Sequence, residues 1–156
     1  MSEPVVVELK STPFAYMSLQ SALAAMPTTM AEGFRSLMGK FAQAKAPMAG
    51  NPLAHYTLFD ATSASFDLGF PVRAEDVEAL RATGLFIGQT PGGRNMTATH
   101  IGPYDTVSET YELMTAAMKR QGLSGAKDMW ESYLSPPDTP PSEIRTDLIW
   151  HVEQAS

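Results

Sequence analysis

The fold of this chain is decided by the segment Trp130-Glu131-Ser132-Tyr133-Leu134-Ser135, which runs into the turn Pro136-Pro137-Asp138-Thr139-Pro140-Pro141. The segment is predicted to be a strand, and a second strand, residues 144–152, is predicted to return beside it as a hairpin. Side chains on a strand alternate between its two faces, so Glu131 and Tyr133 share one face. A carboxylate and a phenol on one strand face predict an acidic, aromatic site.

The composition describes an ordinary globular protein. Hydrophobic residues make up 44% and charged residues 18% of the 156 residues, which suits one domain over residues 1–156. The net charge of −6, with eleven scattered Lys and Arg, argues against nucleic acid and membrane surfaces as partners. The chain has no cysteine and no visible signal peptide or membrane span, so a cytoplasmic location is expected.

Two helices are predicted from capping boxes, in which a threonine hydroxyl and a glutamate satisfy free backbone amides. These boxes are residues 29–32 and residues 106–109. Each opens a stretch with apolar side chains at helical spacing, and Gly122 is expected to end the second helix. An alanine-rich turn over residues 21–27 is expected to stop at Pro27. Further strands are predicted at residues 5–9, 53–59, 66–72, 85–87 and 96–101.

The two halves of the chain are related by an offset of 77 residues. The offset joins Thr29 to Thr106 (106 − 29), and it also joins Phe34 to Tyr111 and Tyr56 to Tyr133. This repetition predicts an α+β fold made of duplicated β-α-β-β units, with pseudo-repeats at about residues 4–73 and 84–153. The units are expected to form a curved antiparallel sheet with two long helices on one side and a central inter-repeat cleft.

The repeat also makes the acidic side chain stand out. The counterpart of Glu131 is position 54 (131 − 77), which is Ala54. Both halves keep the tyrosine, at Tyr56 and Tyr133, but one half alone supplies a carboxylate. A single carboxylate suits one cation or one proton transfer.

Three segments together resemble a known family. They are His100-Ile101-Gly102-Pro103-Tyr104 before a helix, Trp130-Glu131-Ser132-Tyr133, and Arg145-Thr146-Asp147-Leu148. They resemble the GyrI-like effector-binding domains, among them the drug-binding domains of multidrug-responsive transcription activators. The resemblance is clearest from about residue 97 to residue 152. It implies an aromatic-lined pocket in which Glu131, with Tyr133 as its companion, faces lipophilic cations. No helix-turn-helix fits beside the duplicated domain, so a stand-alone member without direct DNA binding is expected.

Three functions follow as alternatives. The first is a binder of lipophilic, cationic or aromatic small molecules, anchored by Glu131. The second, implied by the resemblance, is a hydrolase of strained, cyclopropane-type compounds in which Glu131 and Tyr133 activate water. The third is a protein-interaction module resembling a gyrase inhibitor. The expected ligand-binding residues are Glu131, Tyr133, Tyr56, Trp130, Trp150, Tyr16, His100 and Tyr104.

No cofactor and no metal are expected. A haem-binding family shares the implied architecture, but His55, His100 and His151 form no local ligand pair. The segment Pro91-Gly92-Gly93-Arg94 lacks the ending of a phosphate-binding loop and is interpreted as a bend.

Overall fold

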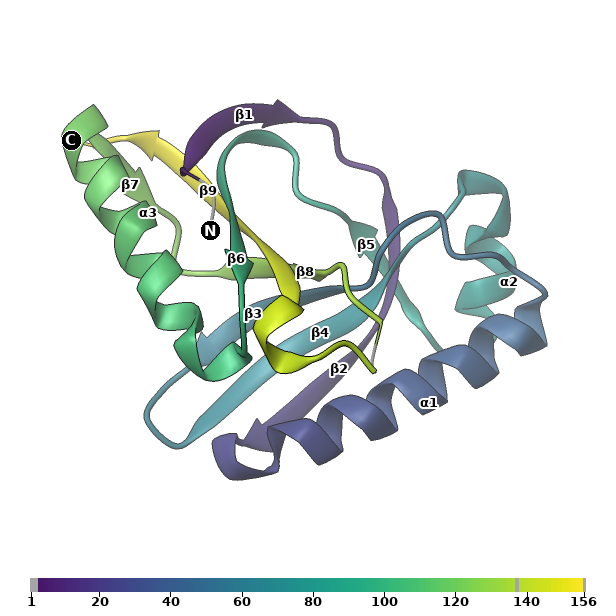
Figure 1. Ribbon diagram of the computed structural model, residues 1–156. Helices are drawn as coiled ribbons and strands as arrows, with labels where there is room; N and C mark the ends of the chain where they lie inside the picture. Colours follow the sequence, from purple (N-terminus) through teal and green to yellow (C-terminus); the bar gives the residue numbers. More distant parts are fainter. Residues whose placement is uncertain (1–2, 137, 156) are drawn as a thin grey trace. The chain divides into compact units, whose positions relative to one another are not determined.

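The computed structural model describes residues 3–136 and 138–155. The chain divides into two compact units. Unit 1 is Met1–Lys10 together with Pro91–Ser156, and unit 2 is Ser11–Thr90. Figure 1 shows the helices and strands of both. Among the described residues, no helix is long and apolar enough to cross a membrane.

Unit 2 is a sheet of four antiparallel strands with two helices. The strands β2 (Pro13–Ala22), β3 (Leu53–Phe59), β4 (Ser63–Pro71) and β5 (Phe86–Gln89) are ordered β5-β2-β4-β3. The helices are α1 (Met26–Ala44) and α2 (Val77–Arg81). A Cβ added at Gly33 of α1 would lie 2.9 Å from Leu19 Cδ1 and 3.0 Å from Leu68 Cδ2, so α1 lies directly on β2 and β4. The core includes Leu37, Phe41, Ala54, Phe66 and Leu68.

Unit 1 repeats this arrangement. Its strands β1 (Val5–Leu9), β6 (Gly93–Ile101), β9 (Arg145–Gln154) and β8 (Met129–Tyr133) are ordered β1-β6-β9-β8, all antiparallel. The short strand β7 (Leu123–Gly125) also pairs with β9. Helix α3 (Val107–Gln121) lies beside β6, β7 and β9 (Figure 1). The core contains Met96, Ala98, Met114, Ala117, Met118, Leu123, Leu148 and Val152.

The order of elements confirms the α+β prediction with antiparallel strands. Each unit contains a strand, a long helix and a following hairpin: β2-α1-β3-β4 in unit 2, and β6-α3-β8-β9 in unit 1. The registers match as well, since Ala54 pairs with Leu68 and Glu131 pairs with Leu148. Ala54 and Glu131 therefore hold equivalent places in the two sheets.

The offset between the repeats changes at the hairpin turn. Tyr56 pairs with Phe66, ten residues on, whereas Tyr133 pairs with Thr146, thirteen residues on. The offset of 77 residues therefore becomes 80 after the turn (146 − 66). The predicted proline-rich turn of residues 136–141 contains Pro137, which lies outside the described residues.

Both helix starts differ from the capping-box prediction. Helix α1 begins at Met26 with Pro27 in its first turn, where a missing N–H costs nothing, so Pro27 starts a helix where a stop was expected. Thr29 lies inside α1 and its hydroxyl bonds to Ser21 Oγ at 2.8 Å. Thr106 does precede α3, but its hydroxyl donates to Pro103 O at 2.9 Å and makes no helix cap.

Candidate functional site

Glu131 lies in the middle of β8, on the sheet face that α3 covers. Its register partner Leu148 is fully buried in the core beneath that helix. Two phenols hold its carboxylate: Tyr111 of α3 donates to Oε2 at 2.9 Å, and Tyr133 of β8 donates to Oε1 at 3.1 Å. The site thus joins a helix and a strand through one acid.

Burial raises the pKa of the Glu131 carboxyl above its ordinary value, and the hydrogen bonds from Tyr111 and Tyr133 offset part of that rise. No Lys, Arg or His in residues 3–136 and 138–155 forms an ion pair with Glu131. A carboxylate removed from water without a positive partner is costly, so the site favours either a proton or a cation.

Tyr104 extends the site on the side of Tyr133. Its ring meets the Tyr133 ring edge-on, with centroids 5.9 Å apart, and half of its surface is exposed. Burial raises the pKa of the Tyr104 phenol, the nearby Thr146 hydroxyl lowers it, and the Glu131 charge raises it further. Thr146 Oγ1 is buried near that phenol, yet it makes no hydrogen bond of normal geometry within the described residues.

Trp150 extends the site on the side of Tyr111. The two rings meet edge-on with centroids 6.0 Å apart, and the Trp150 indole N–H donates to Ala126 O at 2.7 Å. Aromatic side chains therefore flank Glu131 on two sides. Tyr111 and then Trp150 lie on one side, and Tyr133 and then Tyr104 lie on the other. Four of these five residues were expected to bind ligand.

The residue of this group that was not expected to bind ligand is Tyr111, because its place in the predicted helix indicated core packing. The signal was present in the repeat, because the equivalent position in unit 2 is Phe34. Replacing a phenylalanine by a tyrosine adds one hydroxyl, and that hydroxyl reaches Glu131. A tyrosine and an acid that both appear in the same half of a repeat are candidates for a shared site.

His100 and Trp130 lie near this site in sequence but do not contact Glu131 through any described hydrogen bond. His100 is buried; its Nε2 faces Pro103 O at 3.1 Å, so Nε2 carries the proton and Nδ1 accepts from the Thr110 hydroxyl at 2.7 Å. It therefore ties β6 to the start of α3. Trp130 pairs with Ile149 and points to the opposite sheet face from Glu131.

Tyr56 and Tyr16 belong to unit 2 and lie in aromatic clusters of its sheet. The Tyr56 ring packs against Phe66 at 5.3 Å and Phe59 at 6.0 Å. The Tyr16 ring packs against Phe14 at 5.2 Å and Phe86 at 5.7 Å. A ligand-binding role for these two tyrosines stays a prediction.

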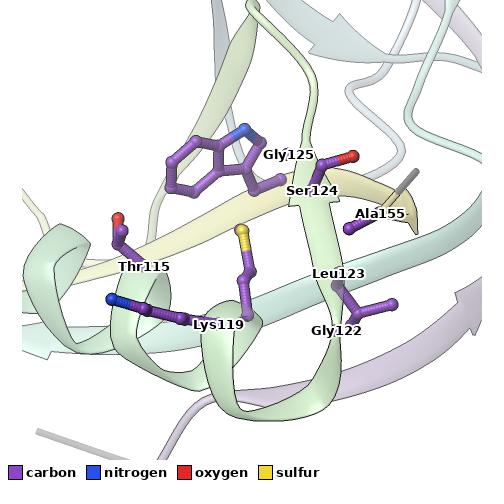
Figure 2. Close-up of a pocket in the computed structure, with 9 residues that line it drawn as sticks. Thr115, Lys119, Gly122, Leu123, Ser124, Gly125 and Ala155 are labelled. Carbon is purple, nitrogen blue, oxygen red and sulfur yellow. The ribbon is translucent and has the colours of Figure 1, made fainter.

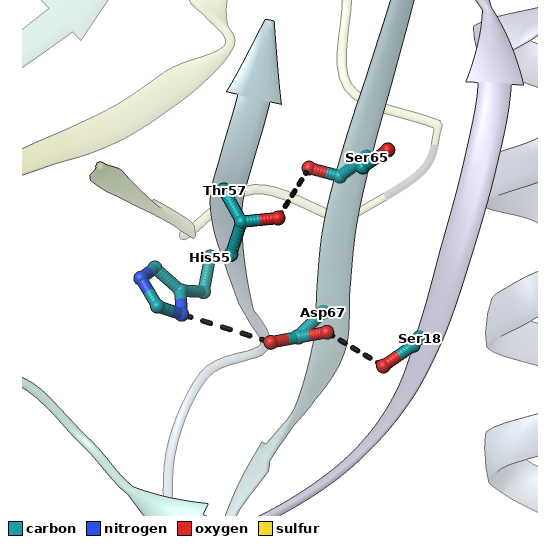
Figure 3. Close-up of polar contacts among 5 residues, drawn as sticks. All are labelled: Ser18, His55, Thr57, Ser65 and Asp67. Carbon is teal, nitrogen blue, oxygen red and sulfur yellow. Dashed lines mark hydrogen bonds and ion pairs between the residues drawn. The ribbon is translucent and has the colours of Figure 1, made fainter. Parts of the chain in front are cut away.

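Unit 2 also carries a polar row on the sheet face opposite α1 (Figure 3). Ser18 Oγ donates to Asp67 Oδ1 at 2.7 Å, and His55 Nδ1 lies 3.7 Å from Asp67 Oδ2. The aspartate stands between the hydroxyl and the imidazole, whereas a catalytic triad needs the imidazole in the middle. Unit 1 has an equivalent pair, in which Thr99 Oγ1 donates to Asp147 Oδ1 at 2.6 Å. Hydroxyl–aspartate pairs of this kind therefore link neighbouring strands in both units.

Metal-binding geometry is absent from the part of the chain that the structure describes. No three His, Asp or Glu side chains there come close enough to hold an ion. His151, the third histidine, is exposed and lies 3.5 Å from Glu153 Oε1.

The sequence pattern of GyrI-like small molecule binding domains matches residues 2–153. The chain belongs to this family. The match spans both units and includes every residue around Glu131. Small-molecule binding is the property that defines this family. No curated protein matches the chain in sequence.

Solved structures of this GyrI-like fold resemble the chain over nearly its whole length. A hydrolase encoded by lin2189 from Listeria innocua is 16% identical with a TM-score of 0.73, covering 97% of this chain and 92% of its own. The EcmrR C-terminal domain is 12% identical with a TM-score of 0.72, covering 97% and 98%. SAV2435 bound to tetraphenylphosphonium is 13% identical with a TM-score of 0.64, covering 97% and 94%. At these identities the likeness establishes the fold alone.

Proposed function

We propose that this GyrI-like domain binds lipophilic cations, with Glu131 as the countercharge. The observation that carries the proposal is the state of that carboxylate. It is desolvated, two phenols hold it, and no positive side chain among the described residues neutralises it. A bound cation would supply the missing charge.

The surrounding rings support the same ligand class. Tyr111, Tyr133 and Tyr104 place aromatic surface beside the acid. Aromatic faces attract cations by about 0.5–2 kcal/mol each, and they also bury the apolar groups of a lipophilic ion. Further support comes from SAV2435, a structural relative that was solved with tetraphenylphosphonium bound.

Binding is tested by thermal unfolding with tetraphenylphosphonium and with the neutral triphenylphosphine oxide. At about 100 times its dissociation constant, a ligand stabilises the native state by ~2.7 kcal/mol, which raises Tm by roughly 5–10 °C in a chain of this size. We expect this shift with the cation for the wild type and for the control Glu143→Gln. Glu143 is exposed and lies outside the site.

Glu131→Gln should remove most of the shift. The variant is nearly isosteric, so loss of binding would report the charge rather than the shape. An equal shift for the cation in Glu131→Gln and wild type, or an equal shift for the neutral compound, would rule out the proposed anchor.

The second candidate function is hydrolysis of a strained, electrophilic ring. Its support is that the pKa of Glu131 is raised, as a general base requires, while each carboxylate oxygen keeps a lone pair for water beside its phenol. Water would attack a ring carbon while Glu131 accepts one of its protons. The electron pair of the broken carbon–carbon bond would pass into an electron-withdrawing group conjugated with the ring, which would then take up a proton, so that the net change is addition of one water. The Listeria innocua hydrolase of the same fold also supports this reading.

The two functions differ in their products. Incubation with a cyclopropane-containing electrophile, followed by mass spectrometry, should give a compound heavier by one water only if the protein is a hydrolase. In that case Glu131→Gln should retain binding and lose turnover. A cation-dependent shift without any product supports binding alone.

A further inference from the structure

A hollow lies in unit 1, where the C-terminal end of α3 meets β7 (Figure 2). Its volume is about 420 Å³, which is within the range of small-molecule pockets, about 300–1,000 Å³. Trp150 is the one lining residue that also belongs to the aromatic group around Glu131; Glu131, Tyr111, Tyr133 and Tyr104 do not line the hollow. The lining residues are Thr115, Met118, Lys119, Gly122, Leu123, Ser124, Gly125, Trp150 and Ala155.

The hollow offers a flat apolar surface. Met118 and Leu123 are buried beneath it, and Trp150 supplies an aromatic wall. The only polar group of the indole is already bonded to Ala126 O, so the wall presents ring atoms alone.

The position of the Trp150 ring is fixed from two sides. A Cβ added at Gly125 would lie 2.5 Å from Trp150 Cε2, so β7 runs directly against the ring because residue 125 is a glycine. On another side, the ring meets Tyr111 edge-on. A wall held in this way needs little ordering when a ligand binds, which favours affinity.

The charge of the hollow is positive. Lys119 is its one charged lining residue, and its ammonium forms no ion pair within residues 3–136 and 138–155. Figure 2 shows the Lys119 side chain running along the helix toward Thr115. Glu153 of β9 alternates with Val152 onto the opposite sheet face, where its Oε1 lies 3.5 Å from His151 Nε2.

From these observations we infer that the hollow binds a flat aromatic carboxylate, with its ring against Trp150 and its carboxylate beside Lys119. The site takes a ligand of the opposite charge to the one proposed for Glu131. The two sites would therefore discriminate between anions and cations on one unit.

Nuclear magnetic resonance with 2-naphthoate tests this site. The Trp150 indole N–H signal is identified by its persistence in Trp130→Phe, because the chain has two tryptophans. Saturable movement of that signal is expected on titration. Lys119→Gln should weaken 2-naphthoate binding roughly fivefold, the size of one exposed charge pair. Arg120→Gln is the matched control: the neighbouring cation does not line the hollow, so it should bind as the wild type does.

A second variant tests the location. Thr115→Trp fills the rim from an exposed helix position, so it should reduce 2-naphthoate binding at least tenfold without unfolding the chain. Glu131→Gln should leave the affinity unchanged, which separates this site from the proposed cation site. A Trp150 signal that does not move, equal affinities for Lys119→Gln and wild type, or loss of binding in Glu131→Gln would each overturn the inference.

Discussion

Glu131 and Tyr111 are two polar residues of unit 1 whose equivalents in unit 2 are apolar. Their equivalents are Ala54 and Phe34, which are apolar and pack in the sheet and helix of unit 2. In unit 1 the same two places carry an acid and a phenol, joined by a hydrogen bond of 2.9 Å. Two positions that are apolar in unit 2 are therefore polar in unit 1. Unit 2 forms the same arrangement of strands and helix without this polar pair, so the fold itself does not require it.

The raised pKa of Glu131 predicts how stability depends on pH. Between the ordinary value, about 4.5, and the raised folded value, the native state binds more protons than the unfolded state, so the free energy of unfolding falls as pH rises. Urea unfolding at several pH values should show this fall in the wild type. Glu131→Gln cannot titrate at this position, so its curve should lack that component; parallel curves would contradict the raised pKa.

Tyr111→Phe should raise the pKa of Glu131 further, because it removes one of the two hydrogen bonds that favour the ionised form. The pH midpoint of tetraphenylphosphonium binding, measured by calorimetry, should then move upward. Tyr104→Phe serves as the control, since the Tyr104 hydroxyl does not donate to Glu131 in any described contact. An equal midpoint in Tyr111→Phe and wild type would show that the phenol does not hold the acid.

The sequence was enough to place Glu131 beside Tyr133, but not beside Tyr111. Glu131 and Tyr133 are two residues apart on a strand, so the period of two alone places them together. Tyr111 is twenty residues away on a helix, and its hydroxyl reaches Glu131 only because the tertiary fold packs α3 against the sheet. Helical spacing predicts which face is buried, but it cannot predict which buried side chain meets a polar partner.

Helix α3 is attached to its sheet by a buried hydrogen-bond group rather than by a cap. His100 of β6 accepts from Thr110 of α3 in a buried contact, and it donates to Pro103 O in a partly buried one. The attachment fixes the first turns of the helix, which carry Tyr111. His100 is therefore a positioning residue for the Glu131 site.

Replacing His100 by Leu should destabilise the chain by about 2–4 kcal/mol, since it leaves the Thr110 hydroxyl buried without its partner. The double variant His100→Leu, Thr110→Val should be less destabilised than the sum of the two single variants. Urea unfolding of the four proteins measures the coupling. Additive losses would mean that the two side chains act independently.

Element prediction succeeded where one local signal dominated. Strand β3 occupies residues 53–59 as predicted, and Gly122 ends α3 with a positive φ of 68°. It failed at Pro27, because a proline is compatible both with a helix stop and with a first turn, and the sequence alone does not choose. It missed β7, because three residues pair with β9 only after the tertiary fold brings them together.

At the scale of the whole chain, β1 completes a sheet that is otherwise built from residues beyond 90. Val5 pairs with Thr97 and Leu9 with Gly93, so β1 protects one edge of β6. Alternation gives its two faces different roles. Val6 packs against the core of unit 1, whereas Val5 is 50% exposed.

Val6→Asp should therefore cost roughly 2 kcal/mol or more by placing a carboxylate against the core, while Val5→Asp should change stability by less than about 0.5 kcal/mol. Hydrogen exchange should also show faster exchange of β6 amides in Val6→Asp. Equal stability of the two variants would contradict the register of β1.

The same strand has a consequence for how the protein is made. The ribosome delivers β1 before its partner residues 93–97, which emerge more than eighty residues later. All of unit 2 is synthesised in between, and residues 11–90 form a compact unit of their own, so unit 2 is able to fold while β1 is still unpaired. Nascent chains should therefore pass through a stage in which the apolar strand β1 is exposed without its partner β6. Chaperones that hold extended segments would find their target in the first ten residues.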